Sequence, residues 1–220
     1  MNQYLLELYS KYWDNYLISI RDGCHEPAAF PFLIAVQDAY KYSEEKVMIC
    51  GQETQGWGNE YDDLESHPTV EQVIDIYKGF VWTDGYNSPY WNFIKAIKKT
   101  LPSKGFVVNN IVKVGKRYGA GCDEEIYRKS MALFPVSQEE KRILAPNVIV
   151  FLTGPKYDCK IRDVFGDFEI RPVSSGIKCL DELIFFDESM PRAIRCYHPG
   201  FLRRNRLSNL YLEEIIKFCR

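Results

Sequence analysis

The sequence predicts an α/β protein with three layers, α/β/α, around a central, mostly parallel four-stranded sheet. Short apolar segments rich in β-branched residues alternate along the chain with longer segments of helical periodicity. Strands that are joined through helices usually run parallel. The chain has 220 residues, of which 46% are hydrophobic, so it can bury one large core. We therefore expect a single domain over residues 1–220.

Four segments have the length and composition of buried strands. Each is bounded by Gly, Pro or charged residues, and each is short for a helix. They are residues 46–50 (KVMIC), 105–114 (GFVVNNIVKV), 147–154 (NVIVFLTG) and 192–198 (RAIRCYH).

Helices are expected between these strands and at both ends of the chain. Apolar residues spaced three and four apart give residues 67–80 and 88–101 one apolar face each. Ser88 followed by Pro89 is a typical helix start. Further helices are expected in two stretches that open the chain and at residues 122–134, 137–144 and 209–219.

Composition limits the classes of partner. Lys and Arg total 28 against 30 Asp and Glu, a net charge of -2, so any contact with nucleic acid must be local. The seven cysteines are scattered and form no C-x-x-C, which favours reduced thiols over disulfides or a zinc site. No apolar run approaches the roughly 20 residues of a membrane span. We expect a cytoplasmic monomer that binds no metal and no cofactor.

Polar side chains follow the predicted strands, where ligands bind in open α/β sheets. Glu53 follows the first strand, Asn110 lies in the second, Thr153 and Gly154 end the third, and His198 ends the fourth. Taken alone, Glu53 is also consistent with a solvated charge and His198 with a structural histidine. A buried amide such as Asn110 needs several hydrogen-bond partners. Their convergence on one sheet edge predicts a site.

In this order the motifs resemble those of the uracil-DNA glycosylase superfamily. GQET at residues 51–54 is similar to the family's first loop, G-Q-D-P-Y-H or G-x-N-P-G, and NIVKV at 110–114 to the strand with the base-recognising Asn. FLTGP at 151–155 and YHPGF at 197–201 are similar to the strand that ends in W-G and to the H-P-S-P loop. The resemblance covers residues 46–206.

The resemblance implies a hydrolase of base excision repair that cleaves the N-glycosidic bond of uracil, or of another damaged base, flipped out of DNA. Glu53 would stabilise the sugar cation and orient the attacking water, and His198 would stabilise the departing base. Asn110 would read the polar edge of the base, beside Gly51 and Gln52.

The resemblance also implies an aromatic platform and a DNA-binding loop. Trp57 is our candidate for stacking on the base, with Tyr61, Phe80 and Trp82 as alternatives. An apolar wedge would fill the gap left by the base, while guanidiniums pair with phosphates. The expected DNA-binding residues are Pro199, Gly200, Phe201, Leu202, Arg203 and Arg204.

Four positions depart from the family pattern. Glu53 stands in place of Asp or Asn, Thr54 in place of Pro, Gln55 in place of an aromatic and Gly200 in place of Ser. Two alternatives therefore stay open: a non-catalytic nucleic-acid or nucleotide-binding module with the same fold, and a hydrolase of another N-glycoside such as a free nucleoside.

Overall fold

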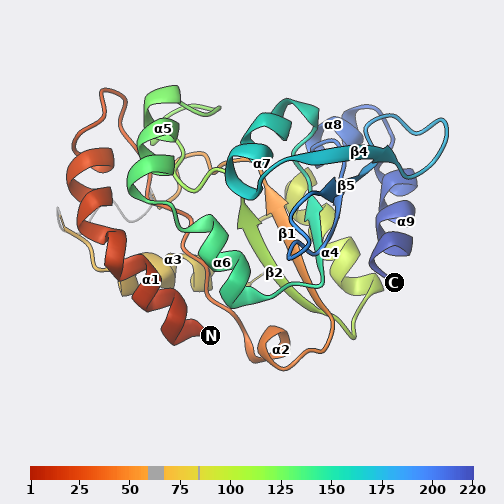
Figure 1. The fold of residues 1–220 in the computed structure, drawn as a ribbon, viewed down its shortest axis with the longest axis horizontal. Coiled ribbons are helices and arrows are strands. Elements are labelled where there is room, and N and C mark those ends of the chain that lie inside the picture. The colour runs from red at the N-terminus through yellow and green to blue at the C-terminus, as the bar shows by residue number, and fades with distance from the viewer. Residues whose placement is uncertain (59–66, 84) are drawn as a thin grey trace. The chain divides into compact units, whose positions relative to one another are not determined.

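The computed structural model describes residues 1–58, 67–83 and 85–220 and confirms the α/β class (Figure 1). The chain divides into two compact units. Unit 1 comprises Met1–Val36, Glu53–Thr83 and Asn110–Leu144, and unit 2 comprises Gln37–Gln52, Asp84–Asn109 and Ala145–Arg220. The expectation of a single domain stays a prediction.

Unit 2 is built on the sheet, which has six strands and not four. The strands are β1 (Lys46–Gly51), β2 (Gly105–Asn110), β3 (Val148–Phe151), β4 (Phe168–Pro172), β5 (Asp181–Phe185) and β6 (Arg192–Arg195). Their order is β2-β1-β3-β6-β5-β4. β3 pairs in parallel with β1 and β6, while β5 pairs antiparallel with β6 and β4, so the sheet is mixed.

The number of strands was predicted wrongly, because β4 and β5 are short and carry charged residues, Glu169 and Arg171 in β4 and Asp181 and Glu182 in β5. β4 is exposed from Glu169 to Pro172, and β5 has only two buried residues, Asp181 and Leu183. Strands with one solvated face carry charged residues at alternate positions. A search for apolar segments therefore does not identify β4 and β5.

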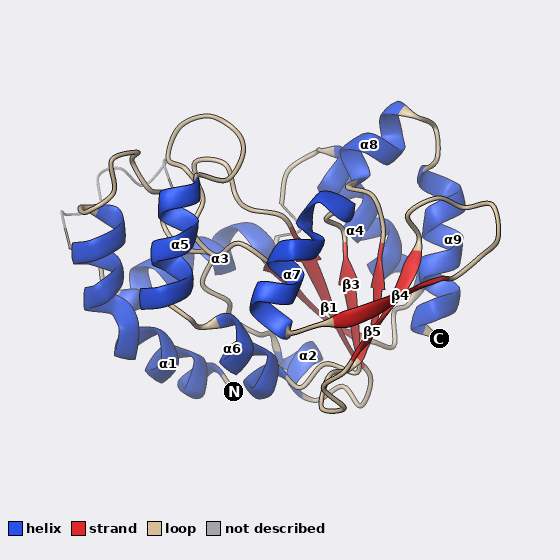
Figure 2. Cartoon of the chain, turned by 45° about the horizontal axis from the view of Figure 1, so that its top comes forward, coloured by secondary structure: helices blue, strands red, loops and turns tan. Residues whose placement is uncertain are grey.

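Helices cover the sheet in unit 2. They are α2 (Asp38–Lys41), α4 (Pro89–Thr100), α7 (Asp158–Phe165), α8 (Pro199–Arg204) and α9 (Ser208–Cys219). Phe165 of α7 packs with its ring centroid 5.9 Å from that of Phe151 in β3. Figures 1 and 2 draw α7 on one face of the sheet and α4 on the other. α4, α8 and α9 contact one another.

Unit 1 is helical. It contains α1 (Asn2–Asn15) continued by a π-helix (Tyr16–Arg21), α3 (Val70–Val81), α5 (Glu124–Leu133) and α6 (Ser137–Leu144). α3 starts with a capping box, in which Thr69 Oγ1 accepts from Gln72 N–H and Gln72 Oε1 accepts from Thr69 N–H. No helix in the described part of the chain is long and apolar enough to cross a membrane.

The predicted helix start at Ser88 and Pro89 is confirmed in unit 2. Ser88 Oγ accepts a hydrogen bond from the Trp91 N–H, and Pro89 opens the helix. The second predicted strand is shorter than expected, because β2 ends at Asn110 and Lys113 lies beyond it. The Lys113 ammonium is buried in unit 1, where it pairs with Glu140 at 2.8 Å.

Candidate functional site

Three of the strand ends predicted to form a site, those of β1, β3 and β6, lie in unit 2. The parallel strands β1, β3 and β6 end at one edge of the sheet, and Gly154 N–H donates to the Cys196 carbonyl at 2.8 Å. Gln52, which follows β1, donates from Nε2 to the Thr153 carbonyl at 2.7 Å. Gly154 adopts a φ of 75°, a conformation that glycine tolerates without strain. Hydrogen bonds therefore join the segment that follows β3 to the segments that follow β1 and β6.

His198 is held in one orientation at this edge. It follows β6 and caps α8, with Nδ1 accepting from the Gly200 N–H at 3.1 Å. Its half-buried ring stacks on Tyr90, with centroids 5.6 Å apart and planes within 6°. Since Nδ1 accepts a hydrogen bond, the proton of the neutral imidazole is on Nε2. His198 can therefore donate one hydrogen bond from Nε2 to a ligand.

The surroundings of His198 keep the imidazole neutral. Burial lowers its pKa below the ordinary value, and the positive charge of Arg204 lowers this pKa further. Because the folded state resists protonation and the unfolded state does not, stability falls as the pH drops below about 6.5. The neutral imidazole can still donate the Nε2 proton in a hydrogen bond to an oxyanion.

Replacing Arg204 by Ala is expected to raise the pKa of His198 toward its ordinary value, because the substitution removes a charge that opposes the imidazolium. An NMR titration of the His198 ring protons would measure this shift. Arg171→Ala, which removes an equal charge from β4, should leave the titration unchanged. An unchanged or lower pKa in Arg204→Ala would contradict this account of the site's electrostatics.

Two hydroxyl groups of unit 2 are buried without a hydrogen-bond partner among the described residues. They are those of Tyr90, which stacks on His198, and of Thr153, which follows β3 and is 1% exposed. Burial raises the pKa of Tyr90, and the nearby Cys50 thiol adds to the effect, so Tyr90 stays protonated. Buried polar groups in proteins are nearly always paired. These two hydroxyls are buried polar groups that no described residue satisfies.

Sequence reasoning missed Tyr90, although a signal was present. Tyr90 is the second residue of α4, and α4 leads into β2 after a four-residue connection. Between two parallel strands, the helix runs back along the sheet toward the start of the next strand. Its first turn therefore lies near the edge where the preceding strands end. An aromatic in the first turn of such a helix is a candidate site residue.

Glu53 and Asn110 belong to unit 1. Glu53 is half-buried and Asn110 is 7% exposed. Behind Glu53, the Gly56 N–H donates to the Lys116 carbonyl at 3.1 Å. A Cβ on Gly115 would lie 2.1 Å from the Thr54 carbonyl oxygen, so only glycine permits this approach. The loop that carries Glu53 is thus fixed by its backbone.

The aromatic candidates are placed differently from expectation. Trp57 is 8% exposed, and its ring packs 4.8 Å from Phe32 and 5.5 Å from Phe80 between centroids, so it offers no free face to a base. Phe80 and Trp82 are half-buried, and Trp82 Nε1 donates to the Ala35 carbonyl. Tyr61 lies outside the described residues. Trp57 is corrected to a member of the aromatic core of unit 1.

The residues expected to form a DNA-binding loop form the helix α8. The expected apolar wedge is wrong for Leu202. Leu202 is fully buried, because α8 turns one side toward its neighbours α4 and α9, so Leu202 cannot enter DNA. Phe201 is exposed and packs its ring on Tyr197. Arg203 and Arg204 are exposed, whereas Pro199 is buried and Gly200 half-buried.

No protein-family model matches the sequence, and no curated protein matches it either. Membership of the glycosylase superfamily stays a prediction. The structure places Gly51, Gln52 and His198 in unit 2, and it places Glu53, Asn110 and Trp57 in unit 1. The convergence of Glu53 with His198 stays a prediction as well.

Proposed function

We propose that the protein is a DNA glycosylase-like hydrolase that cleaves the N-glycosidic bond of uracil, or of another damaged base, flipped out of DNA. The observation that carries the proposal is His198, a neutral imidazole oriented by Tyr90 and Gly200 at the carboxyl edge of a parallel set of strands. In this role His198 donates from Nε2 to the carbonyl oxygen of the departing base.

The other steps follow from the chemistry of the bond. As the base leaves, it takes the bonding electron pair and becomes an anion, while the sugar becomes cationic. Glu53, two residues beyond β1, is assigned to stabilise the sugar cation and to orient the attacking water. Water then adds to the sugar carbon, and its proton passes to the carboxylate.

Recognition of the base is assigned to Asn110, Gly51 and Gln52. An amide offers one donor and one acceptor, which match the adjacent N–H and carbonyl of a pyrimidine. Asn110 is buried at the end of β2, next in the sheet to β1. Arg203 and Arg204 are assigned to phosphates of the strand.

Base release by the purified chain tests the proposal. Labelled single- and double-stranded oligonucleotides carrying uracil, hypoxanthine or a thymine mismatch would be incubated with the protein, and abasic sites would be detected by strand cleavage. Release from one substrate identifies the base. No release from any of them, with the protein folded, refutes DNA base excision and favours the binding module or another N-glycoside.

Tyr90→Leu is expected to raise the pKa of His198 and to lower the rate of base release by up to about tenfold. The substitution removes the stacked ring, and an aromatic pair contributes about 0.5–1.5 kcal/mol. Tyr90→Phe keeps the ring and loses only the hydroxyl, so it should restore the pKa of His198 measured by NMR. If Tyr90→Leu left this pKa unchanged, the Tyr90 ring would not contribute to the burial that lowers the pKa of His198.

A further inference from the structure

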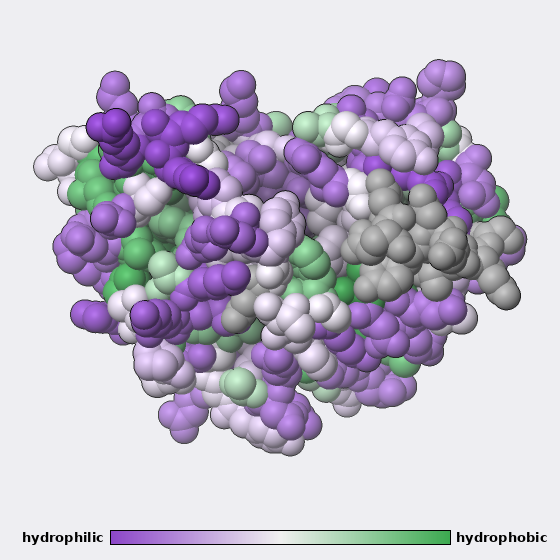
Figure 3. All heavy atoms as spheres, turned by 180° about the vertical axis from the view of Figure 1, so that it is seen from behind, coloured by the Kyte–Doolittle hydropathy of each residue, from purple (hydrophilic) through white to green (hydrophobic). Residues whose placement is uncertain are grey.

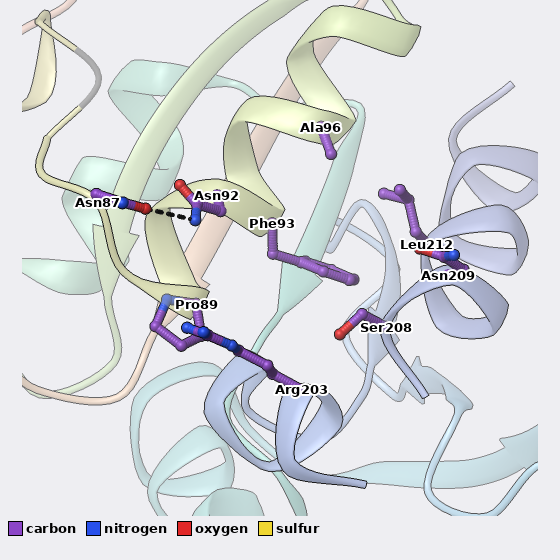
Figure 4. A pocket seen from close by; sticks show the side chains of 9 residues that line it. All are labelled: Asn87, Pro89, Asn92, Phe93, Ala96, Arg203, Ser208, Asn209 and Leu212. Atoms are coloured by element: carbon purple, nitrogen blue, oxygen red, sulfur yellow. Dashed lines mark hydrogen bonds between the residues drawn. The ribbon is translucent and has the colours of Figure 1, made fainter. Parts of the chain in front are cut away.

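Unit 2 contains a pocket of about 310 Å³ between α4, α8 and the start of α9, here called the α4–α9 pocket. Figure 4 shows Arg203 extended beside Pro89. It also shows Phe93 of α4 pointing toward Ser208 and Asn209 at the start of α9. Phe93 is 5% exposed and belongs to the floor of the pocket. The volume suits a nucleotide-sized ligand.

Polar side chains surround this apolar floor. Asn87 and Asn92 lie on one side, joined by a hydrogen bond of 2.8 Å from Asn92 Nδ2 to Asn87 Oδ1 (Figure 4). Ser208 and Asn209 lie on the opposite side. Amides offer both donors and acceptors, so this wall suits the polar edge of a base or the hydroxyls of a sugar.

The charge of the pocket is positive. Arg203 is the cation among the described lining residues, which include no Asp or Glu. Residues 85–110 and 196–212, which supply the pocket, contain no acidic residue. They contain several basic ones: Lys95, Lys98, Lys99, Lys104, Arg203, Arg204 and Arg206. Figure 3 shows strongly hydrophilic side chains gathered where Figure 1 places α8.

The α4–α9 pocket lies close to the His198 edge of unit 2. Pro89 of the pocket directly precedes Tyr90, which stacks on His198, and Arg203 lies at the end of the helix that His198 caps. A nucleotide bound in the pocket would therefore lie beside the site of base release.

We propose that the α4–α9 pocket binds a nucleotide, with the Arg203 guanidinium pairing with the phosphate and Phe93 beneath the base or sugar. Guanidinium matches phosphate through two parallel hydrogen bonds, and an apolar floor with amide walls suits the rest of the nucleotide. The ligand is either a free nucleotide or one unit of a strand. That this strand also carries the damaged base rests on the proposed function.

An NMR titration of the full chain tests the proposal. The probes are thymidine monophosphate, thymidine and a short single-stranded oligothymidylate. The monophosphate should shift the amide signals of Ser208 and Asn209, and thymidine should bind more weakly because it lacks the phosphate. Arg203→Ala should weaken binding of the monophosphate by about tenfold or more. Arg203 is exposed, so this variant should fold, and Arg171→Ala should bind as the wild type does.

The outcomes separate this inference from the proposed function. Tighter binding of the oligothymidylate than of the monophosphate would assign the pocket to a strand, and equal binding would assign it to free nucleotides. An absence of shifts, or equal affinity in Arg203→Ala, would overturn the pocket's role even if the protein released bases. Nucleotide binding without base release would refute the glycosylase activity and leave the pocket assigned.

Discussion

Glu53→Gln is expected to lower the rate of base release by about 10²–10⁴-fold, the range typical of losing a group that assists proton transfer in the transition state. The amide has nearly the same size as the carboxylate but carries no negative charge, so it can neither stabilise the sugar cation nor take a proton from water. The loop around Glu53 is fixed through backbone contacts at Gly56 and Gly115, which the substitution leaves intact.

Single-turnover base release would measure this effect, and oligonucleotide binding to the same variant would separate chemistry from affinity. Glu44→Gln removes an equal charge from an exposed residue before β1 and is the matched control. We expect unchanged binding for both variants and slow chemistry only for Glu53→Gln. Full activity in Glu53→Gln would remove Glu53 from the mechanism.

Lys113→Met is expected to destabilise the protein by about 3–5 kcal/mol, the usual cost of leaving one partner of a buried ion pair alone. Lys113 is 4% exposed and Glu140 is fully buried. The Lys113 ammonium lies 2.8 and 3.0 Å from the two carboxylate oxygens of Glu140, and the Tyr9 hydroxyl donates to one of them at 2.7 Å. Without Lys113, the carboxylate would lose this counter-charge inside unit 1.

Urea unfolding of wild type and variant gives the free energy of unfolding directly. The double variant Lys113→Met with Glu140→Gln should recover part of the loss, because the introduced amide is neutral and its oxygen can still accept from Tyr9. Lys78→Met breaks an exposed pair with Asp75 and should cost less than about 1 kcal/mol. If Lys113→Met lowered the free energy of unfolding by less than about 1 kcal/mol as well, the Lys113–Glu140 pair would not stabilise the fold as a buried ion pair.

Much of the candidate site could be predicted from residues that follow strands. The apolar runs located β1, β3 and β6, and the parallel pairing of these strands brings Gln52, Thr153 and His198 to one edge. The periodicity of residues 88–101 located α4, and Ser88 with Pro89 marked its start. These features could be read locally because they depend on the repeat of the backbone and on residues close in sequence.

The roles of several side chains depended on partners distant in sequence. The sequence by itself determined the α/β class, the buried strands and the order of the polar residues after them, since these follow from hydrophobic periodicity. Only the tertiary structure decided that Tyr90 stacks on His198, that burial and Arg204 keep the imidazole neutral, and that Leu202 is buried. The physical reason is that burial, pKa and stacking are set by neighbours that folding brings together.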